Sequence, residues 1–171
     1  MTKVALRIFS IKLLKITYQI AKLINGKNPR AKTEERKMAN TSVIVIPEGK
    51  ICDYVDGKFR NDTPEEYVRQ TIEKRLVNEH KYLPKQIRIE YTLQLGSRKP
   101  RADIVIFDKD CGEQTQENIK IIIECKKEAV EARNAKDGVE QLKSYMSACP
   151  NCEWGMWTNG RQKEVYHKYV N

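Results

Sequence analysis

Apolar and polar residues alternate over Ile87–Leu95, and this period of two predicts a strand with one buried face. Two later segments, Ala102–Phe107 and Ile119–Glu124, are nearly continuous apolar runs, which are typical of strands buried on both faces. The polar, acidic residues 108–118 predict a loop between these two segments. The pattern therefore predicts three strands at the centre of a sheet.

Helical periodicity appears on both sides of these strands. Thr63 is a good N-cap, Pro64 suits the first helical position, and Glu66 completes a capping box with Thr63. We expect this helix to run to about Glu79, and a second helix to span Asn134–Ala148. The buried faces are predicted to carry Val68, Ile72 and Leu76 in the first helix, and Ala135, Val139, Leu142 and Met146 in the second.

Turn signals predict a hairpin at each end of this series. Asp56-Gly57 indicates a tight turn within a hairpin over Ser42–Asn61, and Asn159-Gly160 indicates a closing hairpin. The strand-like segments of the two hairpins are Val43–Ile46, Ile51–Val55, Glu153–Thr158 and Arg161–Tyr169. From Thr63 onward the order is helix, three strands, helix and two strands, which predicts an α/β fold.

The segment before this domain has a different pattern. Met1–Asn25 carries an apolar stripe with basic residues elsewhere, which predicts an amphipathic helix, and Lys27–Asn40 is polar like a linker. We therefore divide the chain into residues 1–40 and a domain over 41–171. The helix could be a membrane-surface anchor, a partner-binding helix or a nucleic-acid-binding arm. We favour a plain extension or a helix that packs on the domain.

Charge adds little about the domain itself. The chain has 32 Lys and Arg against 23 Asp and Glu, but Met1–Lys37 holds ten of the basic and two of the acidic residues. The remainder is nearly balanced, so any DNA affinity of the domain must come from local patches. The odd number of cysteines and the absence of a signal peptide predict a reduced, cytoplasmic protein, and no apolar run is long enough to span a bilayer.

Three charged residues lie within or directly after the two apolar runs. Asp103 lies inside one run, Glu124 ends the other, and Lys126 follows two residues later. Buried carboxylates on neighbouring strands repel each other unless a cation lies between them, and Mg²⁺ prefers oxygen ligands. Lys126 shares a strand face with Glu124, so it could position an attacking water, while the backbone carbonyl of Cys125 could be a further metal ligand. The alternative is buried ion pairs of the acids with Lys126 or Arg101.

These residues, with the elements around them, resemble the PD-(D/E)XK nuclease superfamily, and more closely the N-terminal nuclease domain of type I restriction enzyme R subunits. The usual proline before the first aspartate is absent, since Ala102 precedes Asp103. The segments that carry the resemblance are TPEEYVRQ (Thr63–Gln70), RADIVIF (Arg101–Phe107), IIIECKK (Ile121–Lys127), QLKSY (Gln141–Tyr145) and WTNG (Trp157–Gly160).

The resemblance implies a restriction-endonuclease-like core, a central mixed sheet flanked by helices, here with an N-terminal helical extension. It implies a Mg²⁺-dependent DNA endonuclease, with Mn²⁺ as a substitute, that acts in restriction or DNA processing. Asp103 and Glu124 would bind the metal, Lys126 would assist the attacking water, and Glu66 would help to hold a metal or its water. The implied partners are DNA and the motor or helicase, specificity or methylation subunits of a restriction system.

Several residues allow two interpretations. Glu66 has a capping role that needs no catalysis, and Glu73, two turns along the same helix face, is a substitute for it. In the resemblance Gln141 and Tyr145 face the active site and DNA, but the same spacing also fits the edge of a core. Arg98 and Lys99 are candidate phosphate contacts before the catalytic strand. The rival functions are a non-cleaving nucleic-acid-binding module of the same fold and an interaction domain that works through the N-terminal helix.

Overall fold

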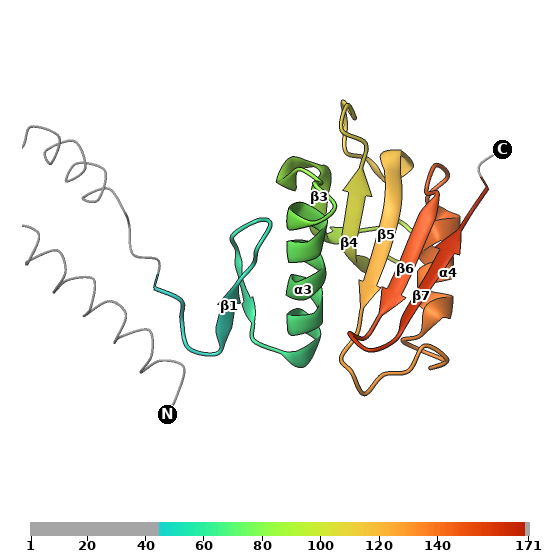
Figure 1. Ribbon diagram of the computed structural model, residues 1–171. Coiled ribbons are helices and arrows are strands. Elements are labelled where there is room, and N and C mark those ends of the chain that lie inside the picture. The colour runs from blue at the N-terminus through green and yellow to red at the C-terminus, as the bar shows by residue number, and fades with distance from the viewer. Residues whose placement is uncertain (1–44, 170–171) are drawn as a thin grey trace, which may run out of the picture. The chain divides into compact units, whose positions relative to one another are not determined.

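The structure is a computed structural model that describes residues 45–169 (Figure 1). The predicted N-terminal helix and linker, residues 1–40, lie outside the described residues. Within residues 45–169 the chain forms an α/β domain with a mixed five-stranded sheet and two α-helices, as the sequence predicts. No helix in this described part is both long and apolar enough to cross a membrane.

The sheet has the strand order β3-β4-β5-β6-β7. Its pairs are antiparallel except β5 with β6, which run parallel and are connected through α4 (Val139–Ala148). The turns η1 (Pro84–Gln86) and η2 (Gln116–Asn118) lead into β3 and β5. The strands are β3 (Ile87–Thr92), β4 (Arg101–Phe107), β5 (Ile119–Cys125), β6 (Trp154–Thr158) and β7 (Lys163–His167).

The two helices cover opposite faces of the sheet (Figure 1). On one face, Ile72 and Leu76 of α3 (Pro64–Asn78) pack in one core cluster with Ile104 and Ile123. On the other face, α4 packs against the alternate residues of the strands, in a cluster of Val105, Phe107, Ile122, Leu142, Met146 and Trp157. Because β4 and β5 are covered on both sides, their sequences are nearly continuous apolar runs, and each fully buried aliphatic side chain stabilises the fold by roughly 1.5–3 kcal/mol.

A separate two-stranded hairpin precedes α3. Strands β1 (Lys50–Cys52) and β2 (Phe59–Asn61) are antiparallel and enclose the Asp56-Gly57 turn, in which Gly57 has a φ of +70°. That conformation favours glycine, and the predicted turn is therefore confirmed. The predicted strand over Val43–Ile46 is wrong for its described residues, because Val45 and Ile46 are exposed and have no strand partner within the described chain.

Two element boundaries differ from the prediction for local reasons. Helix α4 begins at Val139 and not at Asn134, because the Asn134 side chain accepts hydrogen bonds from the amides of Lys136 and Asp137, both at 2.9 Å. This closes a turn before the helix and leaves Ala135 exposed. Strand β3 ends at Thr92 and not at Leu95, since the chain turns back there through a Leu95–Arg98 bridge.

Candidate active site

The candidate site lies where β4 and β5 separate. Their ladder ends at the pair Ile104–Ile123, so the next backbone groups must find other partners. The amide of Asp103 donates to Oε1 of Glu124 at 3.2 Å, and the amide of Cys125 donates to Oδ2 of Asp103 at 2.8 Å. The two carboxylates thus replace the missing ladder bonds and are brought side by side.

Lys126 joins these acids from the end of β5. Its amide donates to the carbonyl of Thr158 at 2.8 Å, and its Nζ lies 3.3 Å from Oε2 of Glu124. The predicted shared face of Glu124 and Lys126 is therefore confirmed. The thiol of Cys125 is buried in the α3 core cluster, on the other side, as expected from the alternation. An ion pair with Lys126 is formed, whereas Arg101 pairs with Glu90 at 3.5 Å.

Burial dominates the electrostatics of this trio. It raises the pKa of Glu124 and of Asp103 above their ordinary values, and the charge of Asp103 raises the pKa of Glu124 further. For Lys126 burial favours the neutral amine, but the charges of Glu124 and Asp103 outweigh it and raise the pKa of the amine. Burial therefore disfavours the ionised carboxylates, and the Lys126 ammonium offsets this only in part.

Glu66 lies in the first turn of α3 and is 4% exposed. Thr63 caps the helix by accepting from the amide of Glu66 at 3.2 Å. The second half of the predicted capping box is wrong, because the Glu66 carboxylate turns away from the cap: it accepts from Nε2 of Gln70 at 2.9 Å and pairs closely with Arg69. Capping therefore does not explain why this carboxylate is buried.

Arg69 lies among several carboxylates of the site. Besides Glu66, its guanidinium lies 3.5 Å from Glu90 and 3.8 Å from both Asp103 and Glu73. The sequence analysis missed this residue, although its position three residues after Glu66 on a helix is a signal for a side-chain pair. Glu73, the predicted substitute for Glu66, is completely buried, and neither of its oxygens has a hydrogen-bond partner among the described residues.

Glu90 was also missed, and its backbone explains why. The alternation of β3 predicts an outward-facing side chain, but Glu90 has a φ of +54°, which is unusual for a residue other than glycine. The register places it opposite Asp103, between the formed pairs Ile89–Ile104 and Tyr91–Ala102. At Asp103, β4 is thus unpaired on both sides: its pairing with β3 is interrupted at Glu90, and its pairing with β5 ends at Ile104. Such strain is concentrated at functional sites, but the amino-acid pattern carried no signal for it.

An open pocket of about 540 Å³ lies at this site; Asp103 and Lys126 line it, whereas the buried Glu124 does not. The lining residues from α3, β3, β4 and the end of β5 are Glu65, Glu66, Arg69, Glu90, Arg101, Asp103 and Lys126. The β1–β2 hairpin contributes Lys50, Phe59, Arg60 and Asn61. The predicted phosphate contacts Arg98 and Lys99 are exposed in the β3–β4 turn and do not line the pocket.

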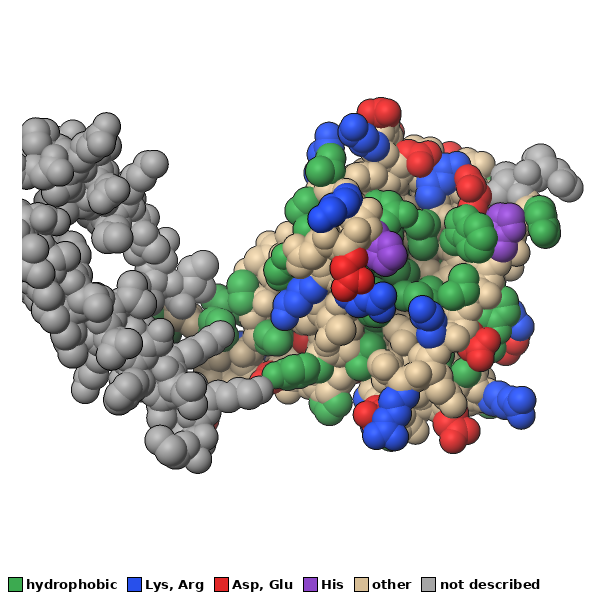
Figure 2. All heavy atoms as spheres, viewed as in Figure 1, with side chains coloured by type: hydrophobic (Ala, Val, Ile, Leu, Met, Phe, Trp, Pro, Cys, Tyr) green, Lys and Arg blue, Asp and Glu red, His purple; other side chains and the backbone are tan. Residues whose placement is uncertain are grey.

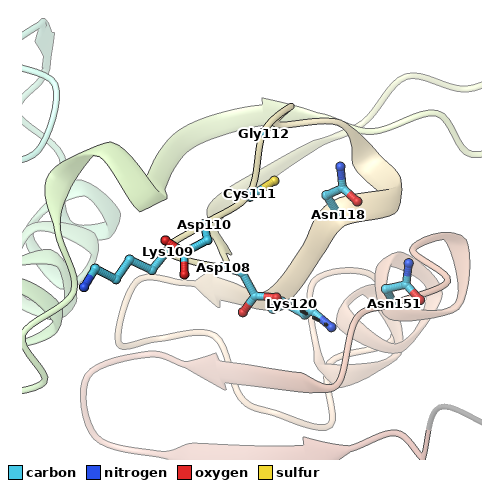
Figure 3. A pocket seen from close by; sticks show the side chains of 8 residues that line it. All are labelled: Asp108, Lys109, Asp110, Cys111, Gly112, Asn118, Lys120 and Asn151. Carbon is cyan, nitrogen blue, oxygen red and sulfur yellow. Dashed lines mark ion pairs between the residues drawn. The ribbon is translucent and has the colours of Figure 1, made fainter.

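A second pocket lies in the β4–β5 loop (Figure 3). Its acids are solvent-exposed, and the side chain of Asp108 is 67% exposed. Asp108 lies 3.8 Å from Lys120. Lys109, Cys111, Gly112, Asn118 and Asn151 complete the lining, and none of the predicted site residues is present. Exposed charges of this kind are solvated, so this pocket lacks the buried, charge-perturbed groups that mark the pocket at Asp103.

Gln141 and Tyr145 lie on α4 and contact each other. Nε2 of Gln141 donates to the Tyr145 hydroxyl at 2.7 Å, while Oε1 of Gln141 is buried without a partner among the described residues. Burial raises the pKa of Tyr145, and the charge of Glu124 raises it further, which places this phenol near the acidic trio. Tyr145 is 5% exposed, so it contributes to the core as well. The pair does not line the open pocket.

The arrangement suits a hard divalent cation. The two oxygens that accept no backbone hydrogen bond already face cationic side chains: Oε2 of Glu124 lies 3.3 Å from Lys126, and Oδ1 of Asp103 lies 3.8 Å from Arg69. Both oxygens are therefore positioned toward positive charge. Among the described residues no three acidic, histidine or cysteine side chains form a metal-binding group on their own. Mg²⁺ commonly uses one or two carboxylates and completes its shell with water and substrate oxygens, so two carboxylates fit it.

Surface charge gives no further site on the face seen in Figure 2. Lys and Arg side chains are scattered among Asp and Glu side chains there and do not form one basic patch. This agrees with the near balance of charge after Lys37. Anion binding by this domain therefore depends on particular side chains.

Fold and site together define an α/β domain with a buried acidic centre where two central strands separate. The family model of the type I restriction enzyme R protein N terminus (HSDR_N) matches residues 64–171, more than half of the chain, and the chain therefore belongs to this family. The resemblance deduced from the sequence is confirmed at this level. No curated protein and no solved structure matches the chain.

Proposed function

We propose that the domain hydrolyses DNA phosphodiester bonds with Mg²⁺, and that its sheet and two helices are a restriction-endonuclease-like core. One observation carries the proposal: the carboxylates of Asp103 and Glu124 each accept a hydrogen bond from a backbone amide of the neighbouring strand where β4 and β5 separate, with Lys126 beside them. Membership of a restriction enzyme family supports it, since restriction requires DNA cleavage.

Each residue of the trio has a distinct role in this proposal. Asp103 and Glu124 would hold the cation, with water and the Cys125 carbonyl as further ligands. The metal, when bound, polarises the phosphate and lowers the pKa of a water. Lys126, kept protonated by its acidic neighbours, would orient the attacking water and stabilise the charge that develops on the phosphate. Glu66 would assist only after its carboxylate leaves Arg69, and Gln141 could bind a water through its unpartnered oxygen.

Cleavage of supercoiled and linear DNA by the full chain in Mg²⁺ or Mn²⁺ tests the proposal. We expect nicking or linearisation that stops with chelator and falls at least about a hundredfold in Asp103→Ala, because a preorganised charge at the reacting phosphate is lost. Asp108→Ala is the matched control, since it removes an exposed acid just beyond the same strand. Cleavage that persists in Asp103→Ala, or its loss in both variants, would contradict the proposed site.

A second candidate function is a nucleic-acid-binding module that does not cleave. The position of Arg69 favours it, because this guanidinium already supplies positive charge to Glu66, Glu90 and Asp103 without a metal. Calorimetric titration with Mn²⁺ separates the two candidates. Binding that disappears in Asp103→Ala supports the nuclease, whereas no binding by the wild-type chain supports the module. DNA and the motor, specificity or methylation subunits of a restriction system are the partners that we propose for either function.

A further inference from the structure

The β1–β2 hairpin lies upstream of residues 64–171, the part that matches the family, yet it forms one wall of the candidate site. Figure 1 shows it beside α3. The register pairs Lys50 with Asn61 and Cys52 with Phe59. Lys50, Phe59 and Asn61 therefore share one hairpin face, and all three line the pocket that contains Asp103. We call these three residues the hairpin face.

The hairpin is held rigidly by charges at its turn. Asp53 is 3% exposed and accepts from the amides of Val55 and Asp56, both at 2.9 Å. Arg60 lies 2.7 Å from Asp53 and donates two hydrogen bonds to Asp56, at 2.8 and 2.9 Å. The guanidinium of Arg60 is thus paired with two carboxylates, and its side chain is only 9% exposed, so most of its charge is neutralised within the hairpin.

A buried glutamine connects the hairpin to the candidate site. The amide of Tyr54 donates to Oε1 of Gln70 at 3.0 Å, and Nε2 of the same glutamine donates to Glu66 at 2.9 Å. The Tyr54 hydroxyl also donates to Asn78, at 3.1 Å, near the end of α3. The hairpin face is therefore fixed with respect to α3 and Glu66 before any ligand arrives, which lowers the entropic cost of binding.

The hairpin face combines an apolar ring with an unneutralised cation. Phe59 is 43% exposed and lines the pocket. The Lys50 ammonium donates to Oδ1 of Asn61 at 2.6 Å and forms no ion pair within residues 45–169. Its charge is therefore available, unlike those of Arg60 and Arg69. An exposed aromatic ring can stack on a base and a cation without an ion pair can contact a phosphate, so these groups together suit a nucleic-acid strand.

We propose that the hairpin face holds the DNA strand next to the phosphodiester at Asp103, with Lys50 paired to a phosphate and Phe59 stacked on a base or sugar. The inference rests on the proposed nuclease function, since it assigns the contact surface of the same site. It replaces Arg98 and Lys99, which do not line the pocket, as the principal DNA contacts. Arg101, 63% exposed at its side chain, lines the same pocket from β4.

Fluorescence anisotropy of labelled single-stranded and duplex DNA with the full chain tests the inference. All variants carry Asp103→Asn, so that cleavage does not disturb the measurement, and all keep the basic residues 1–37. We expect Phe59→Ala to weaken binding by about 5- to 100-fold, as for a lost stacking contact. Lys50→Gln should reduce the slope of log Kd against the logarithm of the salt concentration by about one, because one phosphate contact is lost. Trp154→Ala and Lys109→Ala, an exposed aromatic and an exposed lysine outside this pocket, are the matched controls and should bind normally.

A second measurement avoids any doubt about folding of the alanine variant. Phe59→Trp retains an aromatic ring, and stacking on DNA should quench its fluorescence beyond the change seen for the parent chain. Unchanged affinity in Lys50→Gln and Phe59→Ala, with no added quenching, would overturn the inference and leave the hairpin face to a protein partner. If those variants lose affinity while the wild-type chain binds DNA without cutting it, the hairpin face stands and the proposed nuclease function fails. If the wild-type chain neither binds nor cuts, both fail.

Discussion

The buried carboxylate of Glu73 should make the stability of this domain depend on pH. Glu73 lies on α3 with no exposed surface, its oxygens have no hydrogen-bond partner among the described residues, and Arg69 approaches only to 3.8 Å. Burial, together with the charge of Asp53, raises the pKa of Glu73 from 4.5 to about 8. At neutral pH the folded domain therefore keeps a proton on this residue that the unfolded chain releases.

The sign and the size follow from proton linkage. Between the unfolded pKa of 4.5 and the folded pKa of about 8, the folded state binds more protons, so the free energy of unfolding falls as the pH rises. The slope is about 1.4 kcal/mol per pH unit for one group. From about pH 5.5 to about pH 7.5, Glu73 should thus remove about 2–3 kcal/mol, a large fraction of the stability of an ordinary domain.

Glu73→Gln keeps the shape of the side chain and removes the titration. Urea unfolding of the wild-type and variant chains, in chelator and over this pH range, measures the difference. The two proteins should differ least near pH 5, and the variant should become more stable by about 2–3 kcal/mol near pH 7.5. The contributions of Asp103 and Glu124 are common to both proteins and largely cancel.

Glu79→Gln provides the control, because it removes an exposed carboxylate at the end of the same helix. Parallel pH curves for wild type and Glu73→Gln would refute the reasoning. A variant that is less stable than wild type near pH 7.5 would also refute it, since that result would mean that Glu73 is ionised and favourably paired with Arg69.

Three further substitutions test the packing that positions the site. Gly138→Ala should destabilise the domain by about 2–4 kcal/mol in urea unfolding, because the new Cβ would lie 2.3 Å from the backbone oxygen of Asn134, which cannot move alone. In Gly155→Ala the new Cβ would lie 2.2 Å from the Met146 sulfur, whose flexible side chain can move, so the free energy of unfolding should fall by only about 1 kcal/mol. A larger fall than for Gly138→Ala would contradict this difference between a flexible and a rigid neighbour. Lys168→Met removes hydrogen bonds to three carbonyls at the end of α4 and should lower stability by about 1–2 kcal/mol, with unchanged stability as the contrary result.

The sequence predicted the central strands well because burial on both faces leaves a strong signal. The expected Ala102–Phe107 and Ile119–Glu124 differ from β4 and β5 by one residue each. The start of α4 was missed because helical spacing continues back to Ala135, whereas the Asn134 side chain closes a turn that the spacing does not reveal. Local side-chain to backbone hydrogen bonds compete with helix formation and are hard to infer from periodicity.

The same limit applies to the candidate site. Asp103, Glu124 and Lys126 could be grouped from the sequence, because a charge inside an apolar run is conspicuous and neighbouring strands bring the runs together. Glu90 could not be found, since its left-handed backbone contradicts the alternation of its own strand. The contribution of Lys50 depends on how the hairpin is held against α3, which involves contacts between residues far apart in the sequence. The roles of all these residues remain predictions that the assays above test.

The charges of the pocket are arranged so that a cation and an anionic ligand would meet different residues. A divalent cation at Asp103 and Glu124 would compete with Arg69, which now lies 3.8 Å from Asp103. DNA would instead meet Lys50, which has no ion pair in the described part of the chain, together with the exposed guanidinium of Arg101. Metal binding and DNA binding should therefore respond to separate substitutions: Asp103→Ala should abolish the first, and Lys50→Gln should weaken only the second. That separation is what distinguishes a nuclease site from a set of ion pairs that merely stabilises the fold.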